Sequence, residues 1–512
     1  MNDFVEFPTS FPDAVAIICE SLSLSDIKSL SLVSLEWFDA TSGILSDRSV
    51  FHPSDTEYLK NFKRNFKNFT VSNGTTNDID LFLDNLIELL RRKRKMEEES
   101  QTKYKKYKIE SLKFEGISLN SSNISKLSQL QAVTTLEFIW CTFEVNQHEQ
   151  IEEDLSSLNL KDMKIDLDKE IDLTYVLKIL QDNKNSIKTF HFTTSKLYKC
   201  FLSGSFLSTE SARTIKEHCP NLEELTLERA TTSQIDHIKE LKSLKRLSVS
   251  GPEIHTLNFG DLKLNKLSVH IHNSGRINVT VSDFTVLLAG LPNLTEIDFS
   301  NSDNIFKKVK VEIISLLSNN CPLLVKIDLS GNRSLNEKKK IEVKQFKNLK
   351  ILNFYNTGLK EQILDLIVCP KLQELNLGET DISPNSFKNF ISKTPLLKVL
   401  KCRGLQKFTD KEVFFLGESL KYLRNLELQD CSKLTLKSLE FLIKEQFISD
   451  ITISISQTPN LEDVLKLKEG FYQKMNYFNT LLLSNGYRNI WVFIIDNNKF
   501  KWVDYKFPRT VL

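Results

Sequence analysis

The segment CPKLQELNL, from Cys369 to Leu377, contains the pattern that decides how this chain folds. Its apolar residues follow an LxxLxL spacing, which returns many times along the 512 residues. Clear copies are CPNLEELTL from Cys219, GLPNLTEIDF from Gly290, CPLLVKIDL from Cys321 and TPLLKVLKC from Thr394. When the first apolar residue of each copy is taken as its marker, the markers are Leu222, Leu244, Leu264, Leu294, Leu324, Leu349, Leu372, Leu397, Leu423 and Ile448. Weaker copies have their markers at Phe66, Ile109, Val133, Leu155 and Ile187. The clear markers lie about 25 residues apart on average, which indicates a repeat architecture.

Within each copy, apolar and polar residues alternate, as they do in a β-strand with one buried face. After Leu222, the side chains of Leu225 and Leu227 are predicted to point into the core, and Thr226 between them points away from it. The same phase puts a polar residue at the centre of the outward face of every strand. These residues are Thr226, Ser248, Ser268, Asp298, Asp328, Asn353, Asn376, Lys401, Glu427 and Thr452. A shift by one residue would expose the leucines, so the alternation fixes the predicted strand phase.

Between the strands, the spacing of apolar residues becomes helical. Thr409 and Glu412 have the spacing of a capping box, and Ser383 precedes a proline, Pro384, at a first helical position. A unit of one strand and one helix cannot bury its apolar face alone, whereas units stacked side by side can. The predicted fold class is therefore α/β: a curved horseshoe of parallel strands on the concave side and helices on the convex side.

A strand and a helix repeated at this spacing resemble the leucine-rich repeats, whose period is roughly 20–29 residues. The position three residues after the last core residue of a strand is small or polar, which suits a side chain that satisfies backbone groups of the following turn. Residues at this position include Cys141, Asn332, Thr357, Thr380 and Cys431. This usage resembles the intracellular, cysteine-containing leucine-rich-repeat subtype. Three further cysteines precede prolines at predicted helix ends, and we interpret them as small buried apolar residues rather than reactive thiols. They are Cys219, Cys321 and Cys369.

Composition and charge exclude several classes of protein. Hydrophobic residues make up 40% of the chain and charged residues 26%, which excludes a wholly disordered protein. The net charge is +2, whereas a general nucleic-acid binder is usually far more basic. No apolar run reaches the roughly 18 residues of a membrane span, and the first residues lack the pattern of a secretory signal. The eight cysteines include no CxxC pair, so we expect no zinc cluster and a reducing compartment, the cytoplasm or the nucleus.

Residues 8–51 lie outside the repeat and are predicted to form short amphipathic helices. Residues 11–13 read Phe-Pro-Asp, residues 26–27 read Asp-Ile, and residues 46–51 read Ser-Asp-Arg-Ser-Val-Phe. This arrangement resembles an F-box, and an F-box followed by such repeats is similar to the F-box/leucine-rich-repeat family. The residues that the resemblance assigns to adaptor binding are Phe11, Pro12, Leu22, Ile27, Leu30, Val33 and Trp37. The alternative interpretation is a small helical cap over the open end of the repeats.

The resemblance implies a function. In that family, the F-box binds a Skp adaptor attached to a cullin–RING scaffold, the repeats hold a protein substrate, and a separate enzyme transfers ubiquitin. The chain would then be a non-enzymatic substrate-recognition subunit that supplies proximity. It would need no cofactor, and we expect no nucleic-acid or membrane partner. The alternative is a leucine-rich-repeat scaffold or inhibitor unrelated to ubiquitin, with a helical cap at its start.

The sequence contains no strong motif for chemistry of its own. It has no GxxxxGK loop, no GxSxG elbow and no HExxH. His270 and His272 share a predicted strand face but have no clear third ligand, so a solvated or substrate-facing pair is favoured over a metal site. The basic run from Arg91 to Lys95 continues in several lysines up to Lys108. We interpret it as an exposed helix end and loop, with nuclear import or an acidic partner as the alternative.

The substrate is expected on the concave strand face of the later repeats, where solenoids usually bind. Along this face the charge passes from acidic to basic, with one aromatic residue near the middle. The predicted substrate-binding residues are Asp298, Asp328, Asn353, Tyr355, Glu374, Asn376, Lys401 and Arg403.

The expected domain organisation has four parts. They are an F-box-like domain at residues 8–51, a linker with a first repeat, a helix and the basic run at 52–108, the repeats at 109–458, and a C-terminal cap at 459–512. The cap is predicted to contain a helix near residues 461–467 and a hairpin of residues 490–495 and 500–503.

Overall fold

The computed structural model of the chain describes the repeats almost completely. The described residues are 50–51, 67–72, 75–100, 109–130, 133–144, 153–166, 174–193, 209–251, 254, 257–259, 262–271, 279–336, 340–444, 448–454, 480–484, 490–496 and 499–505. They form two compact units, unit 1 (Met1–Arg229) and unit 2 (Ala230–Leu512). The predicted F-box-like domain lies outside the described residues, apart from β1 (Val50–Phe51) at its end.

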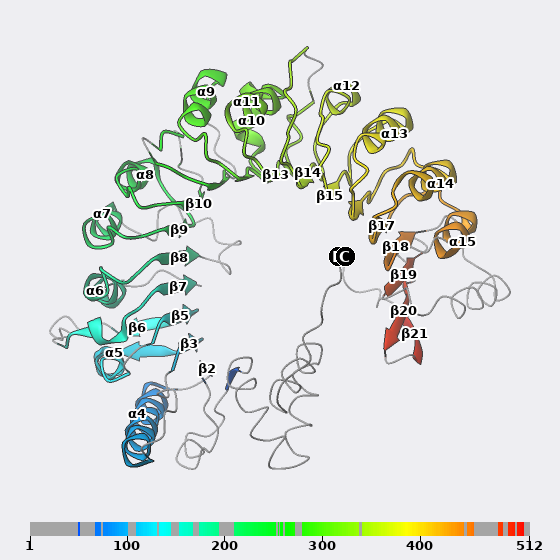
Figure 1. Ribbon diagram of the computed structural model, residues 1–512. Coiled ribbons are helices and arrows are strands. Elements are labelled where there is room, and N and C mark those ends of the chain that lie inside the picture. Colours follow the sequence, from blue (N-terminus) through cyan, green and yellow to red (C-terminus); the bar gives the residue numbers. More distant parts are fainter. Residues whose placement is uncertain are drawn as a thin grey trace. The chain divides into compact units, whose positions relative to one another are not determined.

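Unit 1 contains a sheet of parallel strands with helices on one face (Figure 1). In pairing order its strands are β1, β2 (Asn68–Ser72), β3 (Ser111–Glu115), β5 (Thr135–Ile139), β7 (Asp162–Asp166), β8 (Thr189–Thr193) and β9 (Glu224–Leu227). A second, two-stranded sheet pairs β4 (Ser118–Asn120) with β6 (Thr142–Glu144). The helices are α4 (Thr76–Ser100), α5 (Ser121–Leu127), the 3-10 helix η2 (Leu155–Leu158), α6 (Thr174–Asp182) and α7 (Thr209–His218).

Unit 2 continues the same architecture with more repeats. Its parallel strands pair in chain order: β10 (Arg246–Ser250), β11 (Lys266–His270), β12 (Glu296–Asp298), β13 (Lys326–Asp328), β14 (Ile351–Asn353), β15 (Glu374–Asn376), β16 (Val399–Lys401), β17 (Asn425–Leu428), β18 (Asp450–Ser454) and β19 (Thr480–Ser484). Its helices are α8 (Thr232–Ile238), α9 (Val281–Ala289), α10 (Asp303–Val309), α11 (Glu312–Asn320), α12 (Glu361–Leu364), α13 (Pro384–Ser392), α14 (Asp410–Ser419) and α15 (Leu436–Lys444). Within unit 2 these helices lie on the convex side of the sheet and the strands on the concave side (Figure 1). The chain thus has the predicted leucine-rich-repeat fold.

The alternation of side chains is the one that the sequence predicts. Leu375 of β15 and Leu400 of β16 are buried and directly opposite each other in the pairing register. Every clear marker residue lies two positions before the first residue of its strand, as with Leu372 and Glu374. The core is therefore a stack of leucine ladders, and burying one such side chain stabilises the fold by roughly 1.5–3 kcal/mol.

One of the weaker markers is wrong. Leu155 does not precede a strand, because Leu155 and Leu158 are buried in the short helix η2. Asp154 caps that helix at its start, and Asn159 ends it in a left-handed conformation with φ of 54°. The strand β7 follows only at Asp162, so Leu160 is the true marker. The segment LSSLNL matches the LxxLxL spacing, but its first two leucines belong to the preceding turn of the repeat.

The residues three positions after the last core residue of a strand donate hydrogen bonds to backbone carbonyls of their own turn, of the preceding repeat, or of both. Asn332 is fully buried, and its Nδ2 donates to the carbonyl oxygens of Phe299 and Leu329 at 2.8 and 2.7 Å. Thr357 donates to the Phe354 carbonyl at 2.8 Å, and the thiol of Cys431 donates to the Cys402 carbonyl at 3.1 Å. The equivalent bonds of Cys141 and Thr380 are also present. The predicted role of this position is confirmed.

The predicted helix starts and buried cysteines are confirmed as well. Thr409 and Glu412 form the capping box of α14, and Ser383 caps α13 with Pro384 in its first turn. Six cysteines lie in the described residues; all six are free and buried. Burial raises the pKa of the Cys219, Cys321 and Cys369 thiols to about 12.

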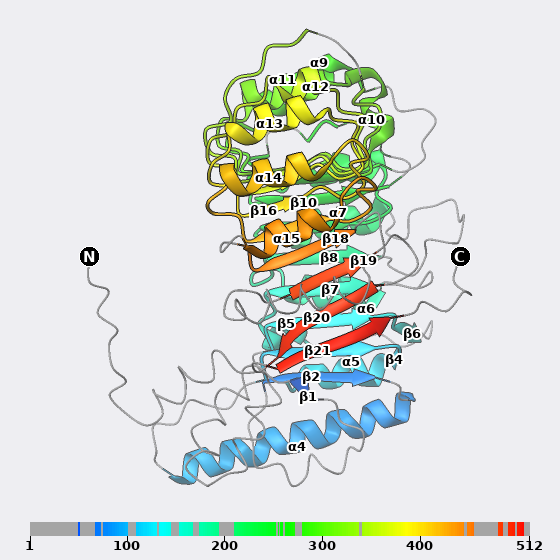
Figure 2. The same ribbon diagram turned by 90° about the vertical axis from the view of Figure 1, so that its right-hand side faces the viewer.

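The C-terminal segment adds a hairpin to the sheet. The strand β19 pairs in parallel with β18, beyond the point at which the sequence repeat fades. It is followed by β20 (Ile490–Asp496) and β21 (Lys499–Tyr505), which are both antiparallel to their neighbours (Figure 2). The predicted hairpin is confirmed, while the helix expected near residues 461–467 lies outside the described residues. Among the helices that the structure describes, none is long and apolar enough to cross a membrane.

Candidate protein-binding surface

The concave face of unit 2 carries a row of polar side chains, one from the centre of each strand. The pairing register places each of these residues directly opposite the next. In order they are Ser248, Ser268, Asp298, Asp328, Asn353, Asn376, Lys401, Glu427 and Thr452. Neighbouring strands lie about 4.8 Å apart, so the nine residues form a continuous polar row. We call this row and the residues on either side of it in strands β10–β18 the concave face.

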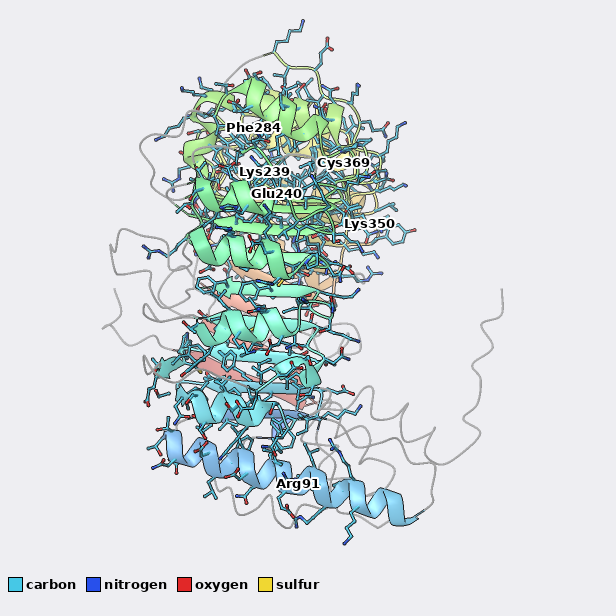
Figure 3. All side chains as sticks on the ribbon, turned by 90° about the vertical axis from the view of Figure 1, so that its left-hand side faces the viewer. Arg91, Lys239, Glu240, Phe284, Lys350 and Cys369 are labelled. Atoms are coloured by element: carbon cyan, nitrogen blue, oxygen red, sulfur yellow. The ribbon has the colours of Figure 1, made fainter. Side chains whose placement is uncertain are left out.

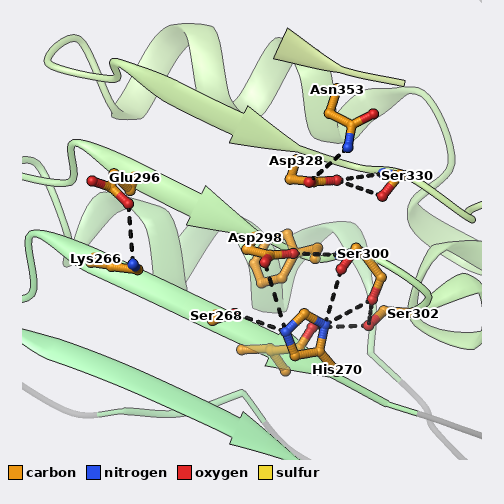
Figure 4. Close-up of polar contacts among 12 residues, drawn as sticks. Lys266, Ser268, His270, Glu296, Asp298, Ser300, Ser302, Asp328, Ser330 and Asn353 are labelled. Atoms are coloured by element: carbon orange, nitrogen blue, oxygen red, sulfur yellow. Dashed lines mark hydrogen bonds and ion pairs between the residues drawn. The ribbon is translucent and has the colours of Figure 1, made fainter. Parts of the chain in front are cut away.

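The acidic residues of the row also hold the backbone turns that follow their strands. Asp298 Oδ1 accepts a hydrogen bond from the backbone N–H of Ser300 at 2.9 Å, and Asp328 Oδ1 accepts one from Ser330 at 2.9 Å. Asn353 Oδ1 likewise accepts a hydrogen bond from the backbone N–H of Tyr355 at 3.0 Å. Side chains of Asp and Asn form such turns with their own backbone. Each side chain is thereby fixed in one orientation on the face, as Figure 4 shows for Asp298 and Asp328.

The same turn geometry continues at Asn376, whose Oδ1 accepts from the N–H of Gly378 at 3.1 Å. Gly378 leaves room for the side chain of Tyr355, which lies in the turn after the neighbouring strand β14. A Cβ atom at Gly378 would lie 3.0 Å from Tyr355 Cδ2 and 3.1 Å from the carbonyl oxygen of Arg403. The absence of a side chain therefore lets the half-buried Tyr355 ring pack over the backbone toward Arg403.

In the basic half of the face, neighbouring carboxylates offset part of the positive charge. Arg403 Nε lies 3.0 Å from Asp430 Oδ2 and 4.0 Å from Glu379 Oε1. Burial disfavours the charged form of Arg403, but the nearby carboxylate of Asp430 outweighs it, so the pKa of Arg403 is raised. Lys401 and Glu374 are exposed on neighbouring strands. The predicted substrate-binding residues thus lie on the concave face, except Tyr355 and Arg403, which lie in the turns two residues after β14 and β16. Of the two cations in the set, only Lys401 has no ion-pair partner among the described residues.

A histidine-centred network on β11 and its neighbours was not part of the predicted binding set. His270 Nε2 lies 2.8 Å from Ser268 Oγ and 3.8 Å from Asp298 Oδ2, and His270 Nδ1 lies 2.9 Å from the carbonyl oxygen of Ser300 (Figure 4). A carbonyl can only accept, so Nδ1 of His270 carries a proton and donates to Ser300. Ser268 is only 6% exposed, so its hydroxyl is covered and not available as a nucleophile.

The possible partner of His270 in a metal site, His272, lies outside the described residues. Among the residues that are described, no group of three or more His, Cys, Asp or Glu side chains could hold a metal ion.

Unit 1 has a comparable row of its own. In pairing register its central residues are Lys113, Glu137, Lys164, His191 and Thr226. His191 Nδ1 lies 2.7 Å from Thr226 Oγ1. Opposite charges alternate at Lys113, Glu137 and Lys164 of this row, whereas the row of unit 2 has two neighbouring acidic residues, Asp298 and Asp328, with no cation between them. For all of these residues of unit 1 except Lys164 the signal was in the sequence, because each lies four positions after its predicted marker. Lys164 follows Leu160, whereas the sequence predicts the marker of this repeat at Leu155.

Comparisons with known proteins show similarity to repeat structures at low identity. No protein-family model matches the chain, and no curated protein matches it. Among solved structures, an internalin from Listeria monocytogenes is 15% identical with a TM-score of 0.42, covering 75% of this chain and 92% of the internalin chain. The structure of a TLR13–ssRNA13 complex is 17% identical with a TM-score of 0.44, covering 86% of this chain and 56% of the TLR13 chain.

A third similar structure is the complex of Rad7 and Elc1 in yeast. The matched chain of that complex is 14% identical to this chain with a TM-score of 0.35, and the match covers 93% of this chain and 93% of the matched chain. At these identities and TM-scores, the three structures carry no argument about function.

Proposed function

We propose that the chain is a substrate-recognition subunit of a Skp–cullin–F-box ubiquitin ligase. Residues 8–51 bind the Skp adaptor, and the concave face of unit 2 binds a protein substrate. The subunit itself is not an enzyme, because ubiquitin transfer is done by a separate protein and this chain supplies proximity. It acts in the cytoplasm or the nucleus.

The observation that carries the substrate half of the proposal is the fixed polar row of the concave face. Asp298, Asp328, Asn353 and Asn376 are each held by a hydrogen bond to the turn that follows, so little conformational entropy is lost when a partner binds. Tyr355 provides an aromatic anchor near the middle of the row, of the kind that dominates protein interfaces. The concave face lies on the side of the sheet opposite to helices α8–α15 (Figure 1).

The support for the adaptor half is the F-box-like pattern in residues 8–51, which include Pro12, Val33 and Trp37. The pattern is followed by leucine-rich repeats, the combination that the F-box/leucine-rich-repeat family has. A receptor of this kind needs two separate binding surfaces and no catalytic group.

Co-purification from cells of two variants separates the two surfaces. A combined Tyr355→Ala, Lys401→Ala and Arg403→Ala variant should retain the Skp adaptor and cullin and lose the substrate proteins. A Trp37→Ala variant should retain the substrates and lose the adaptor. If neither adaptor nor cullin accompanies the unmodified chain, the alternative of a scaffold or inhibitor protein is favoured. If the triple variant keeps every partner, the substrate lies elsewhere.

A further inference from the structure

One edge of unit 2 has an unusual concentration of positive charge. At four successive repeats the chain enters strands β14, β15, β16 and β17 through the buried marker residues Leu349, Leu372, Leu397 and Leu423. The two residues before each marker and the one after it lie at this edge. None of these residues is acidic, and six are exposed cations: Lys347, Lys350, Lys371, Lys398, Lys421 and Arg424. We call these six residues, together with Leu396 and Tyr422, the basic edge.

The backbone holds the residues of the basic edge in neighbouring positions. The carbonyl oxygen of Lys350 accepts from the N–H of Gln373 at 2.8 Å, and the carbonyl of Gln373 accepts from the N–H of Lys398 at 2.7 Å. The carbonyl of Lys398 in turn accepts from the N–H of Arg424 at 2.8 Å. The N–H of Lys350 itself donates to the carbonyl of Val325 at 2.8 Å, so the ladder places Lys350, Lys398 and Arg424 at equivalent positions before β14, β16 and β17. Figure 3 shows Lys350 projecting from this edge, on the same side as Cys369.

Three of these cations have no ion-pair partner among the residues that the structure describes. Lys347, Lys350 and Lys398 form no ion pair with any described residue. The patch also has a clear boundary, because the same positions in the two preceding repeats, around Leu294 and Leu324, hold no charged residue. Positive charge of one sign in a limited area produces a local field that attracts an anionic partner. The small net charge of the whole chain, +2, means that this field is local rather than a property of the molecule.

Two apolar side chains interrupt the cations. Leu396 is 40% exposed and Tyr422 is 53% exposed, and they occupy the same position, directly before the marker, in consecutive repeats. Few large apolar residues are this exposed in the described part of the chain. Tyr and apolar side chains with charged neighbours are typical of anchor points in protein interfaces.

We propose that the basic edge is a second docking site, separate from the concave face, for an acidic protein segment that carries an apolar side chain. The carboxylates pair with the lysines and Arg424, and the apolar side chain packs between Leu396 and Tyr422. Four strands about 4.8 Å apart span a length that about four to five extended residues would cover. A single-stranded nucleic acid is the less suitable occupant, because such sites use several aromatic residues for base stacking and the edge has one, Tyr422.

The test measures fluorescence anisotropy of a labelled peptide with the full chain at about 50 mM salt, where charge screening is weak. The probe is a peptide of roughly a dozen residues, all Asp and Glu except for two central leucines. We expect a Kd on the order of 10–100 µM, and a loss of affinity of about tenfold or more in a Lys350→Glu and Lys398→Glu variant. The matched control is Lys242→Glu and Lys263→Glu, which makes the same change of charge at this edge in earlier repeats of unit 2 and should change the affinity less than about twofold.

A Tyr422→Ser variant tests the apolar half. It should reduce the affinity for the leucine-containing peptide to that for a wholly acidic peptide of the same length. Circular dichroism and thermal melting of each variant check that it remains folded, which is expected because the substituted residues are exposed. The proposal is overturned if the two double variants bind equally, if the wholly acidic peptide binds the unmodified chain as tightly as the leucine peptide, or if a single-stranded oligothymidine of equal length binds more tightly than either.

Discussion

The side-chain amide of Asn353 donates a hydrogen bond of 2.8 Å to Oδ2 of Asp328 on the neighbouring strand. The other carboxylate oxygen of Asp328 accepts from Ser330, and the amide oxygen of Asn353 accepts from Tyr355. Each side chain therefore accepts a hydrogen bond from its own turn with one oxygen atom and is hydrogen-bonded to the other side chain through its second polar atom. The middle of the concave face is a linked polar surface before any partner binds, which favours a partner whose charges match it.

Strand phase can be tested by substituting two adjacent residues of β15. Leu375→Ala removes a buried side chain from the leucine ladder and should lower the free energy of unfolding by about 2–5 kcal/mol. Asn376→Ala removes an outward side chain with one turn hydrogen bond and should cost about 1 kcal/mol or less. Urea denaturation of both variants measures the difference. Equal losses would mean that the two side chains do not point to opposite faces.

The turn ladder predicts a large effect at a polar residue. Asn332→Ala leaves the buried carbonyl groups of Phe299 and Leu329 without their donor, and the N–H of Ser302 without the acceptor that now lies 2.9 Å away. We expect a loss of about 2–4 kcal/mol in the free energy of unfolding. Asn348→Ala, at the edge of the sheet, is the control and should cost under about 0.5 kcal/mol. A small effect at Asn332 would show that water replaces the side chain.

Asp410 predicts a pH dependence of stability. Burial alone would raise the pKa of this carboxyl, but the hydrogen bonds from Ser438 and Thr435 outweigh burial and lower it. A lowered pKa in the folded state means that the contribution to stability is fully present above the unfolded pKa, about 3.9, and is lost as the pH falls through the lower folded value. The difference in melting temperature between the unmodified chain and Asp410→Asn should therefore be constant near neutral pH and shrink below about pH 4. A difference that is the same at pH 3 and pH 7 would contradict this assignment.

The buried cysteines should resist alkylation. Burial raises the pKa of the thiols of Cys219 and Cys321 to about 12, so almost no thiolate is present at pH 8. Iodoacetamide labelling followed by peptide mass spectrometry should leave both residues unmodified in the folded protein and label them in guanidinium chloride. Rapid labelling of either one in native conditions would mean that its repeat opens locally.

The strand phase and the polar row could be predicted from the sequence because their periods are short. Alternation at every second residue, together with leucines at every repeat, leaves one register in which Leu375 is buried and Asn376 is outward. The prediction was wrong at Leu155, where the same spacing of leucines occurs in a helical turn. Only the left-handed Asn159 and the core residue Met163 show that the strand begins later.

The partners of the site residues could not be predicted in the same way. Arg403 is paired with Asp430, and His270 with the Ser300 carbonyl, across turns whose lengths differ from repeat to repeat. The sequence identifies which residues share a row, but the position two residues beyond a strand depends on how the following turn bends. The sequence therefore predicts a stronger acidic-to-basic gradient than the structure has, because Asp430 offsets the positive charge of Arg403.

The most direct test of the proposed function is a titration of the purified full chain with a purified Skp adaptor by isothermal calorimetry. The proposed function predicts one-to-one binding with a Kd below about 1 µM. Trp37→Ala should reduce the affinity about 30-fold or more, corresponding to on the order of 2–4 kcal/mol, and leave the melting temperature of the repeats unchanged. Absence of heat at micromolar concentrations, or binding that Trp37→Ala leaves intact, would contradict it.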